Sequence, residues 1–354
     1  RIAGAKGDRG GVWFDGPLEM GMDVCLRSRV AVRVLMRLAE IEAADGVTLY
    51  AAARGVPWRD WLTTRCTFAV FANVRDTPGL THSGFAALKV KDAVADALRE
   101  AFGARPDVDA ESPEVSIALH LAGGRGGIFL DLAGEALHRR GTRVAMVDAP
   151  LKETLAAAVL MLGGAHPDLP FIDPMCGSGT LDIEHALATR GIAGGIRRRF
   201  GFERWPTLSA EARAAWGRLR ERADEQAAAA MKDTWPEVVC ADVDPAALIA
   251  ARQNAAAAGL DDVIVFERAD VTALERRWLA ATLATNPPYG ERLQPVALDA
   301  IYRGIGQTFQ RLSGWRAIVL SGNPALEQAL RRKPAVSHRL WNGPLEARLL
   351  RYDL

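Results

Sequence analysis

A glycine-rich turn between a short apolar run and a helical pattern constrains the fold of this chain more than any other feature. The turn is Cys176-Gly177-Ser178-Gly179; residues 169–173 before it predict a buried strand, and the residues after it show helical spacing as far as Gly191. Four further apolar runs downstream have the length of strands: residues 238–242, 263–266, 281–285 and 316–320. Helical patterns interleave with these strands, which predicts an α/β domain built on a parallel sheet.

The turn also predicts a ligand site. Glycines let the backbone approach a ligand closely, and the first N–H groups of the following helix are free to bind it. A phosphate loop would require a lysine before Thr180, where the chain has Gly179, and a dinucleotide fingerprint would require a third glycine. Two candidates remain: a cofactor that lacks phosphate and has an amino-acid tail, whose ammonium Asp173 can bind, and a tight turn that binds nothing.

Acidic residues follow the next two predicted strands. Asp242 ends the strand at 238–242, where a carboxylate suits the two hydroxyls of an unphosphorylated ribose. Its alternative role is to cap the next helix, although Asp244 is better placed for that. Asp270 follows the third strand and can accept a hydrogen bond from an adenine amino group; taken alone, it also fits an ordinary loop acid.

The sequence Asn286-Pro287-Pro288-Tyr289 ends the fourth predicted strand. Two prolines fix the backbone and remove N–H donors, so that carbonyl groups point outward. The Asn286 amide oxygen and the Pro287 carbonyl can then accept both hydrogens of an exocyclic amine and aim its lone pair at an electrophilic methyl group. Tyr289 can stack on a base that has left its helix. By itself the motif also fits a rigid turn, but its place after the glycine loop and Asp242 favours amine methylation.

These motifs carry a family resemblance. Residues 173–180 together with 286–293 (NPPYGERL) resemble the class I S-adenosylmethionine-dependent methyltransferases that modify exocyclic amines, and are most similar to the bacterial 23S ribosomal RNA guanine-N2 methyltransferases. The resemblance implies a Rossmann-like sheet and S-adenosylmethionine as cofactor. It assigns the cofactor to Asp173, Met175, Cys176, Gly177, Gly179, Thr180, Asp242 and Asp270, and the target base to Asn286, Pro287, Pro288 and Tyr289. Some relatives carry a second methyltransferase domain after this one, whereas this sequence stops at Leu354.

The first 150 residues show an α+β pattern, in which strand-like pieces alternate with helices such as residues 86–102. Residues 80–92 and 137–141 resemble the RNA-binding THUMP domain of the same enzymes. We therefore expect three parts: the remainder of a ferredoxin-like unit at 1–45, a THUMP-like domain at 46–149 and the methyltransferase domain at 150–354. The chain begins without a Met and close to a strand-like run, so we expect the start of the first unit to be missing.

RNA binding has to come from local clusters of charge, because 44 Lys and Arg residues face 43 Asp and Glu residues, which excludes a polybasic tail. The insertion at 190–225 has a local excess of arginine, with Phe200, Phe202 and Trp205 placed for base stacking. The alternative is a helical insertion whose arginines are only solvated, and we prefer it for the later ones. The predicted RNA contacts are Lys89, Lys91, Arg139, Arg140, Arg197, Arg198 and Arg199.

Cysteine, histidine and hydropathy patterns narrow the class of protein further. The four cysteines lack metal-ligand spacing and the six histidines are scattered, which indicates reduced thiols, no metal site and a cytoplasmic location. The longest apolar stretch, residues 155–165, is shorter than the ~18 residues that span a bilayer. The predicted function is N2-methylation of a guanine in 23S ribosomal RNA or a ribosomal precursor. The alternatives are tRNA guanine-N2 methylation, adenine-N6 methylation of RNA or DNA, and a non-catalytic RNA-binding assembly factor.

Overall fold

The computed structural model describes residues 2, 4–8, 10–146, 150–290 and 295–354. The chain forms two compact units: one comprises residues 1–137 and 199–222, and the other residues 138–198 and 223–354. This division differs from the predicted boundaries after residues 45 and 149. Residues 199–222 join the first unit although they lie between strands of the second, because their buried side chains pack on the first unit. Residues 147–149, at the predicted boundary, lie outside the described residues.

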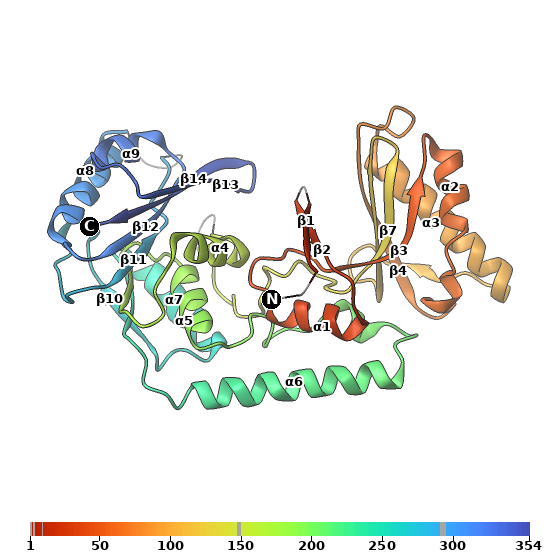
Figure 1. The fold of residues 1–354 in the computed structure, drawn as a ribbon, viewed down its shortest axis with the longest axis horizontal. Coiled ribbons are helices and arrows are strands. Elements are labelled where there is room, and N and C mark those ends of the chain that lie inside the picture. The colour runs from red at the N-terminus through yellow and green to blue at the C-terminus, as the bar shows by residue number, and fades with distance from the viewer. Residues whose placement is uncertain (1, 3, 9, 147–149, 291–294) are drawn as a thin grey trace. The chain divides into compact units, whose positions relative to one another are not determined.

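The first unit contains a five-stranded sheet with helices on one face (Figure 1). Its strand order is β3-β7-β6-β4-β5, and β4 pairs with β6 in parallel while β6 and β7 form an antiparallel hairpin. The strands are β3 (Leu35–Glu42), β4 (Thr67–Arg75), β5 (Asp107–Val108), β6 (Val115–Ala122) and β7 (Arg125–Asp131). The helices are α1 (Leu18–Arg27), α2 (Gly46–Arg54) and α3 (Ser83–Phe102), with a hairpin of β1 (Lys6–Asp8) and β2 (Gly11–Trp13) and the short helix η1 (Trp58–Asp60).

Apolar residues that alternate along the strands, or recur at helical spacing along the helices, explain most of these elements. On α3, Val90, Val94 and Leu98 are buried as predicted, whereas Phe102 at the last turn is 52% exposed. A capping box between Asp45 and Thr48 begins α2, a helix that the sequence analysis did not predict. The sequence patterns also missed α1 and β3, whose alternation is interrupted by a bulge near residue 38.

The insertion forms η2 (Gly201–Arg204) and the long helix α6 (Ala210–Ala230). Its aromatic residues are not available for base stacking, so that prediction is wrong. Phe200 and Phe202 are at most 2% exposed, and the Phe202 ring packs edge-on against Trp216 with 4.9 Å between centroids. The apolar spacing of α6 buries these rings, and most of its arginines face solvent, as the alternative prediction expected.

The second unit is built on a seven-stranded sheet with the order β10-β9-β8-β11-β12-β14-β13. All pairs from β10 to β12 are parallel, and β14 enters antiparallel between β12 and β13. The strands are β8 (Phe171–Asp173), β9 (Val238–Asp242), β10 (Ile264–Arg268), β11 (Thr282–Thr285), β12 (Arg316–Ser321), β13 (Val336–Asn342) and β14 (Leu345–Asp353). The predicted Rossmann-like sheet is confirmed, including the hairpin that turns at Gly343.

Helices cover both faces of this sheet, so its central strands are buried on both sides. Side chains of α4 (Glu153–Gly163), α5 (Thr180–Thr189) and α7 (Pro245–Ala258) form one apolar core with the sheet. Side chains of α8 (Pro295–Arg311) and α9 (Pro324–Leu330) form the other, beside the short helix η3 (Val271–Ala273). The strand order reverses between β8 and β11, and ligands of open α/β sheets bind at such a switch point, at the carboxyl ends of the strands.

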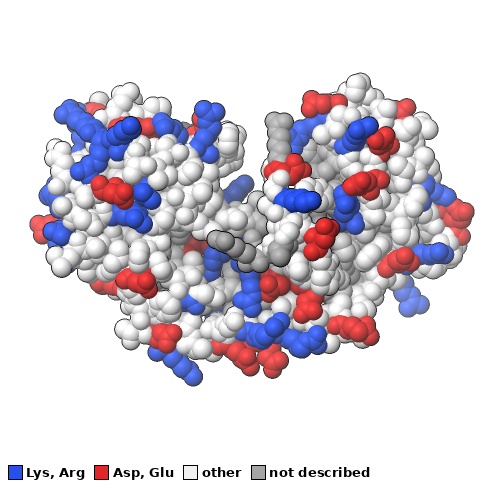
Figure 2. Space-filling view, in the orientation of Figure 1, with Lys and Arg blue, Asp and Glu red and all other residues white. Residues whose placement is uncertain are grey.

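Acidic and basic side chains are interspersed over the face drawn in Figure 2, in keeping with the balanced composition. None of the described helices combines the length and the apolarity needed to cross a membrane.

Candidate active site

The glycine loop lies at the switch point, between β8 and α5. Its two glycines have positive φ angles, +53° at Gly177 and +79° at Gly179, which other residues rarely adopt. The Gly179 N–H donates to the Cys176 carbonyl oxygen over 2.9 Å, and the Cys176 N–H donates to the Ala241 carbonyl oxygen over 3.0 Å. The loop is therefore closed on itself and attached to the end of β9.

Asp173, the last residue of β8, is 2% exposed. Its Oδ1 accepts the Met175 N–H over 3.0 Å. Burial raises its pKa to about 7, with the nearby Asp242 carboxylate acting in the same direction and the Met175 N–H in the opposite one. A cationic partner would stabilise the ionised form of this buried carboxylate. The ammonium of an amino-acid tail is such a partner.

Asp242, the last residue of β9, orders two loops at once. Its Oδ2 accepts the Gly177 N–H over 3.0 Å and its Oδ1 accepts the Asp244 N–H over 2.9 Å. Helix capping falls to Asp244, which accepts the Ala246 N–H, so the two aspartates divide the roles as predicted from sequence. Each carboxylate oxygen can accept more than one hydrogen bond, which leaves Asp242 able to bind hydroxyl groups.

Asp270 lies in the loop after β10 and is exposed. Its Oδ1 accepts from both the backbone N–H and the hydroxyl of Thr272, each over 2.8 Å, and caps η3. The structure thus supports the ordinary loop role directly and leaves Oδ2 for a ligand. The adenine contact stays a prediction.

Asn286 directly follows β11, the strand that pairs with β8 in the sheet. The Tyr289 hydroxyl donates a hydrogen bond to Asn286 Oδ1 over 2.7 Å. Burial raises the pKa of Tyr289 to about 12, with Asn342 opposing the shift. The Pro288 carbonyl accepts the Tyr302 hydroxyl over 2.7 Å. Residues 291–293, which extend the motif in the family resemblance, lie outside the described residues.

Three residues that the sequence analysis missed hold Tyr289 in place. Asn323 Nδ2 donates to the Tyr289 carbonyl oxygen over 3.0 Å, and Asn342 at the β13–β14 turn interacts with its hydroxyl. A Cβ atom at Gly322 would overlap the Tyr289 ring carbons, so the ring lies directly on this glycine. Gly322 and Asn323 follow β12 and could have been suspected from their place at the carboxyl end of a strand.

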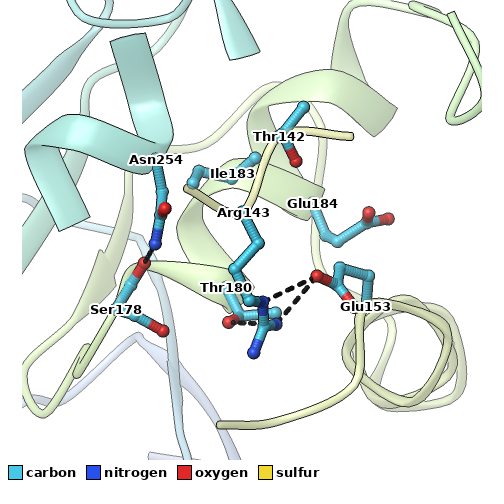
Figure 3. A pocket seen from close by; sticks show the side chains of 8 residues that line it. All are labelled: Thr142, Arg143, Glu153, Ser178, Thr180, Ile183, Glu184 and Asn254. Atoms are coloured by element: carbon cyan, nitrogen blue, oxygen red, sulfur yellow. Dashed lines mark hydrogen bonds and ion pairs between the residues drawn. The ribbon is translucent and has the colours of Figure 1, made fainter. Parts of the chain in front are cut away.

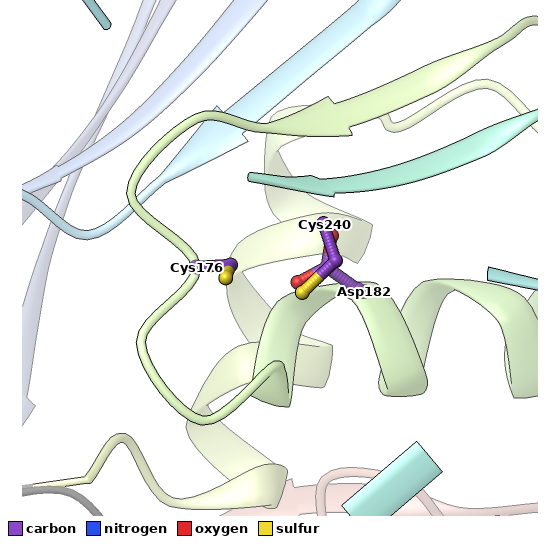
Figure 4. A group of neighbouring side chains, drawn as sticks. All are labelled: Cys176, Asp182 and Cys240. Carbon is purple, nitrogen blue, oxygen red and sulfur yellow. The ribbon is translucent and has the colours of Figure 1, made fainter. Parts of the chain in front are cut away.

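A buried polar cluster lies behind the glycine loop (Figure 4). The Sγ atoms of Cys176 and Cys240 and a carboxylate oxygen of Asp182 lie within 4.8 Å of one another. Burial, with a further contribution from Asp173, raises the pKa of Asp182 well above its usual value. A hydrogen bond from Cys240 lowers the pKa of Cys176, but burial and nearby acids raise it to about 12 overall. A metal would have to displace protons from all three groups, and the absence of a metal stays a prediction.

Five of the seven predicted RNA contacts are accessible: Arg139, Arg197 and Arg199 are exposed, whereas Lys89 and Lys91 are partly buried. The other two are buried, which corrects the prediction. Arg140 is 1% exposed and pairs with the equally buried Glu184 over 3.1 Å. Arg198 is 8% exposed and donates to the Arg139 carbonyl oxygen over 2.9 Å. Runs of arginine do not reveal which member turns inward, because that depends on the packing of the loop.

The site residues fit S-adenosylmethionine. The buried Asp173 suits its ammonium, the positive-φ glycines allow the backbone to approach its methionine part, and Asp242 suits its ribose. The strand order brings these groups and Asn286 to one edge of the sheet. The arrangement can therefore present an amine nitrogen, held at Asn286, to a methyl donor held by the loops after β8 and β9.

Comparisons with known proteins agree with this fold. The family model for an RMKL-like methyltransferase domain matches residues 140–351, and the THUMP domain model matches residues 43–131. The ribosomal RNA large subunit methyltransferase K/L of Syntrophotalea carbinolica is 43% identical over 98% of this chain, and that of Methylococcus capsulatus is 41% identical over 99%. This chain spans about half the length of these relatives, 49% and 48%.

Solved structures give the same result. SMU.472, described as a methyltransferase and solved with S-adenosylhomocysteine, is 31% identical with a TM-score of 0.88, over 98% of this chain and 91% of that one. A predicted N6-adenine-specific DNA methylase from Listeria monocytogenes is 29% identical with a TM-score of 0.87, over 98% and 89%. The chain therefore belongs to the family of RMKL-like, S-adenosylmethionine-dependent methyltransferases, here joined to a THUMP domain.

Proposed function

We propose that this chain transfers a methyl group from S-adenosylmethionine to the exocyclic N2 amine of a guanine in 23S ribosomal RNA. The observation that carries the proposal is the placement of Asn286 and Tyr289 after β11, beside the strand that ends in Asp173. The THUMP domain supports RNA as the substrate, and the names of the curated relatives support ribosomal RNA. Such a substrate places the protein in the cytoplasm.

The chain's own groups contribute binding and orientation. The cofactor supplies an electrophilic methyl group on its sulfonium. Asp173 and the glycine loop would hold its methionine part, Asp242 its ribose and Asp270 its adenine. The Asn286 amide oxygen and the Pro287 carbonyl would accept the two amine hydrogens, which directs the nitrogen lone pair, while Tyr289 stacks on the base. Positioning of this kind accelerates transfer without a strong base. Methylation makes the nitrogen cationic and therefore acidic, so it releases its proton to solvent after the methyl group has been transferred.

RNA would be bound by exposed or partly exposed basic residues of the two units. Lys89 and Lys91 lie on α3, and the Lys89 ammonium is 5.4 Å from the centroid of the Phe85 ring. Arg139 lies just after the first of the three points at which the chain passes between the units, and Arg197 and Arg199 lie at the second. Replacing these five residues by alanine should weaken RNA binding at low salt and reduce its salt dependence.

The test is to incubate the protein with labelled S-adenosylmethionine and, separately, 23S ribosomal RNA, ribosomal precursors and tRNA, and to identify the modified nucleoside by mass spectrometry. N2-methylguanosine in 23S RNA is the expected product. N6-methyladenosine, or label confined to tRNA, would contradict the proposed substrate. Binding of RNA and cofactor without transfer would indicate an assembly factor.

Two variants refine this test. Asn286→Ala should abolish transfer while S-adenosylhomocysteine and RNA still bind, because it removes one acceptor of the target amine and none of the proposed cofactor contacts. Gln253→Ala, an exposed change on α7, serves as the matched control and should retain activity. Full activity of Asn286→Ala would refute the assigned mechanism.

A further inference from the structure

Asn254, a residue of α7, ties together two segments that are distant in sequence. Its side chain is buried, with 3% of the residue exposed. The amide oxygen accepts the N–H groups of Val144 and Ala145, each over 2.9 Å. The amide nitrogen donates to the Ala145 carbonyl oxygen over 2.9 Å and to the Ser178 carbonyl oxygen over 3.1 Å. One side chain thus makes four hydrogen bonds, two to each of its polar atoms, which is its full capacity.

Arg143 attaches the same segment from the other side (Figure 3). Its guanidinium donates to the Leu151 carbonyl oxygen over 2.6 Å and to the Thr180 hydroxyl over 3.2 Å, and pairs with Glu153 over 2.9 Å. Arg143, Glu153 and Thr180 line a small pocket with Asn254 and Ser178. Residues 142–145 are therefore held against both ends of the Ser178–Thr180 stretch.

The Ser178 carbonyl belongs to the peptide group between Ser178 and Gly179, and Ser178 lies between the two positive-φ glycines of the loop. Fixing this carbonyl fixes the orientation of the Ser178–Gly179 peptide plane. The Gly177 N–H is fixed on the opposite side by Asp242. The loop is consequently held from two directions, and Asn254 supplies the only side-chain hydrogen bond to the Ser178 carbonyl among the described residues.

We propose that Asn254 is a positioning residue for the cofactor: it holds the glycine loop in its binding conformation and makes residues 142–145 part of the cofactor site. The inference rests on the proposed cofactor role of the glycine loop. Because coupling between two sites is reciprocal, cofactor binding should in turn stabilise the hydrogen bonds of residues 144 and 145. Asn254 acts through the loop in this proposal, because all four of its hydrogen bonds go to backbone groups of the chain.

Two variants distinguish the contributions of the amide oxygen and the amide nitrogen of Asn254. Asn254→Asp keeps an oxygen for the Val144 and Ala145 N–H groups but sets a carboxylate against the carbonyls of Ala145 and Ser178. Asn254→Ala removes all four hydrogen bonds. Titration calorimetry with S-adenosylhomocysteine should show affinity reduced roughly 10- to 100-fold in both variants, since each loses at least two buried hydrogen bonds. RNA affinity should stay within about twofold, because the RNA contacts proposed above lie elsewhere.

The controls are Gln253→Ala, exposed on the same helix, and Val159→Ala, which leaves a cavity in the core at α4 and lowers stability without removing a hydrogen bond to the loop. Amide hydrogen exchange gives a second readout: S-adenosylhomocysteine should slow exchange at Val144 and Ala145 in the unmodified protein and not in Asn254→Ala. If the Asn254 variants lose no more affinity than Val159→Ala, or if the ligand leaves exchange at residues 144 and 145 unchanged, the inference is wrong while the proposed function stands. If the unmodified protein binds no S-adenosylhomocysteine, both are wrong.

Discussion

The hydroxyl of Tyr289 donates a hydrogen bond to the amide oxygen of Asn286 across 2.7 Å. The two residues proposed to handle the target base are therefore coupled, and the hydroxyl fixes which side of the amide presents its oxygen. An amide oxygen has two lone pairs, so Asn286 can accept an amine hydrogen in addition to this bond. The contact gives Tyr289 two separable functions, orientation of Asn286 through the hydroxyl and stacking through the ring.

Substitutions at Tyr289 should separate these functions. Tyr289→Phe keeps the ring and should lower kcat for methyl transfer by roughly fivefold, the value of one hydrogen bond of about 1 kcal/mol. Tyr289→Ala also removes stacking, worth about 1–3 kcal/mol per base, and should lower kcat/KM by roughly 100-fold. Steady-state kinetics with RNA check both values, with S-adenosylhomocysteine affinity unchanged as the control. Equal activity of the two variants would show that the ring does not stack on the target.

Gly322→Ala should act through the Tyr289 ring. The added methyl group would overlap the ring carbons, so the ring has to move from its place beside Asn286. We expect kcat/KM for RNA to fall roughly tenfold or more, through lost stacking, while S-adenosylhomocysteine affinity stays within about threefold. Gly217→Ala on α6, where a Cβ atom would meet open space, is the matched control. Undiminished transfer by Gly322→Ala would contradict the role given to the ring.

Cofactor affinity should depend on pH through Asp173. Its pKa is raised to about 7 by burial, and an ammonium binds the ionised carboxylate, so affinity should rise with pH up to about 7 and then level off. Below that value, each pH unit should cost roughly a tenfold loss of affinity. Calorimetric titration with S-adenosylhomocysteine at several pH values measures the profile. Asp173→Asn should bind weakly with a flat profile; a pH dependence that persists in this variant would assign the titration to another group.

The raised pKa of Asp173 also affects the folding stability of the ligand-free protein. Because the folded-state pKa of Asp173 exceeds its usual value of 3.8, the folded state keeps a proton that the unfolded state releases. The stability contributed by Asp173 is therefore fully present below 3.8 and is lost as pH rises to about 7. Urea unfolding in the absence of ligand should show this slope reduced in Asp173→Asn.

His185 should produce the opposite slope. Its ring stacks on Phe171 with 4.0 Å between centroids, and burial lowers its pKa from 6.5 to about 4. Below pH 6.5 the unfolded state binds a proton at His185, whereas the folded state binds it only near pH 4. The stability contributed by the neutral His185 is therefore present above pH 6.5 and is lost as pH falls towards 4. The loss between pH 7 and pH 5 should be roughly 2 kcal/mol. Urea unfolding of His185→Phe should lack it, whereas the exposed His338→Gln should retain it.

The location of the candidate site was largely readable from the sequence. Asp173, Asp242 and Asn286 each end or follow an apolar run, and parallel strands bring such positions to one edge of the sheet. Local patterns also predicted the glycine loop, the Asp244 cap and the terminal hairpin, because these depend on backbone preferences of adjacent residues. The same reasoning missed α1, α2 and β3, whose apolar patterns are short or interrupted.

Only the tertiary structure decided which side chains of a given type face inward. Arg140 and Arg198 resemble their neighbours in sequence but are buried, and Phe202 lies in an apolar core rather than on an RNA-binding surface. Likewise, the support of Tyr289 by Gly322 and of Ser178 by Asn254 joins residues far apart in the chain. Such contacts depend on how loops pack around the sheet, and a local sequence pattern carries no information about a partner that packing alone selects.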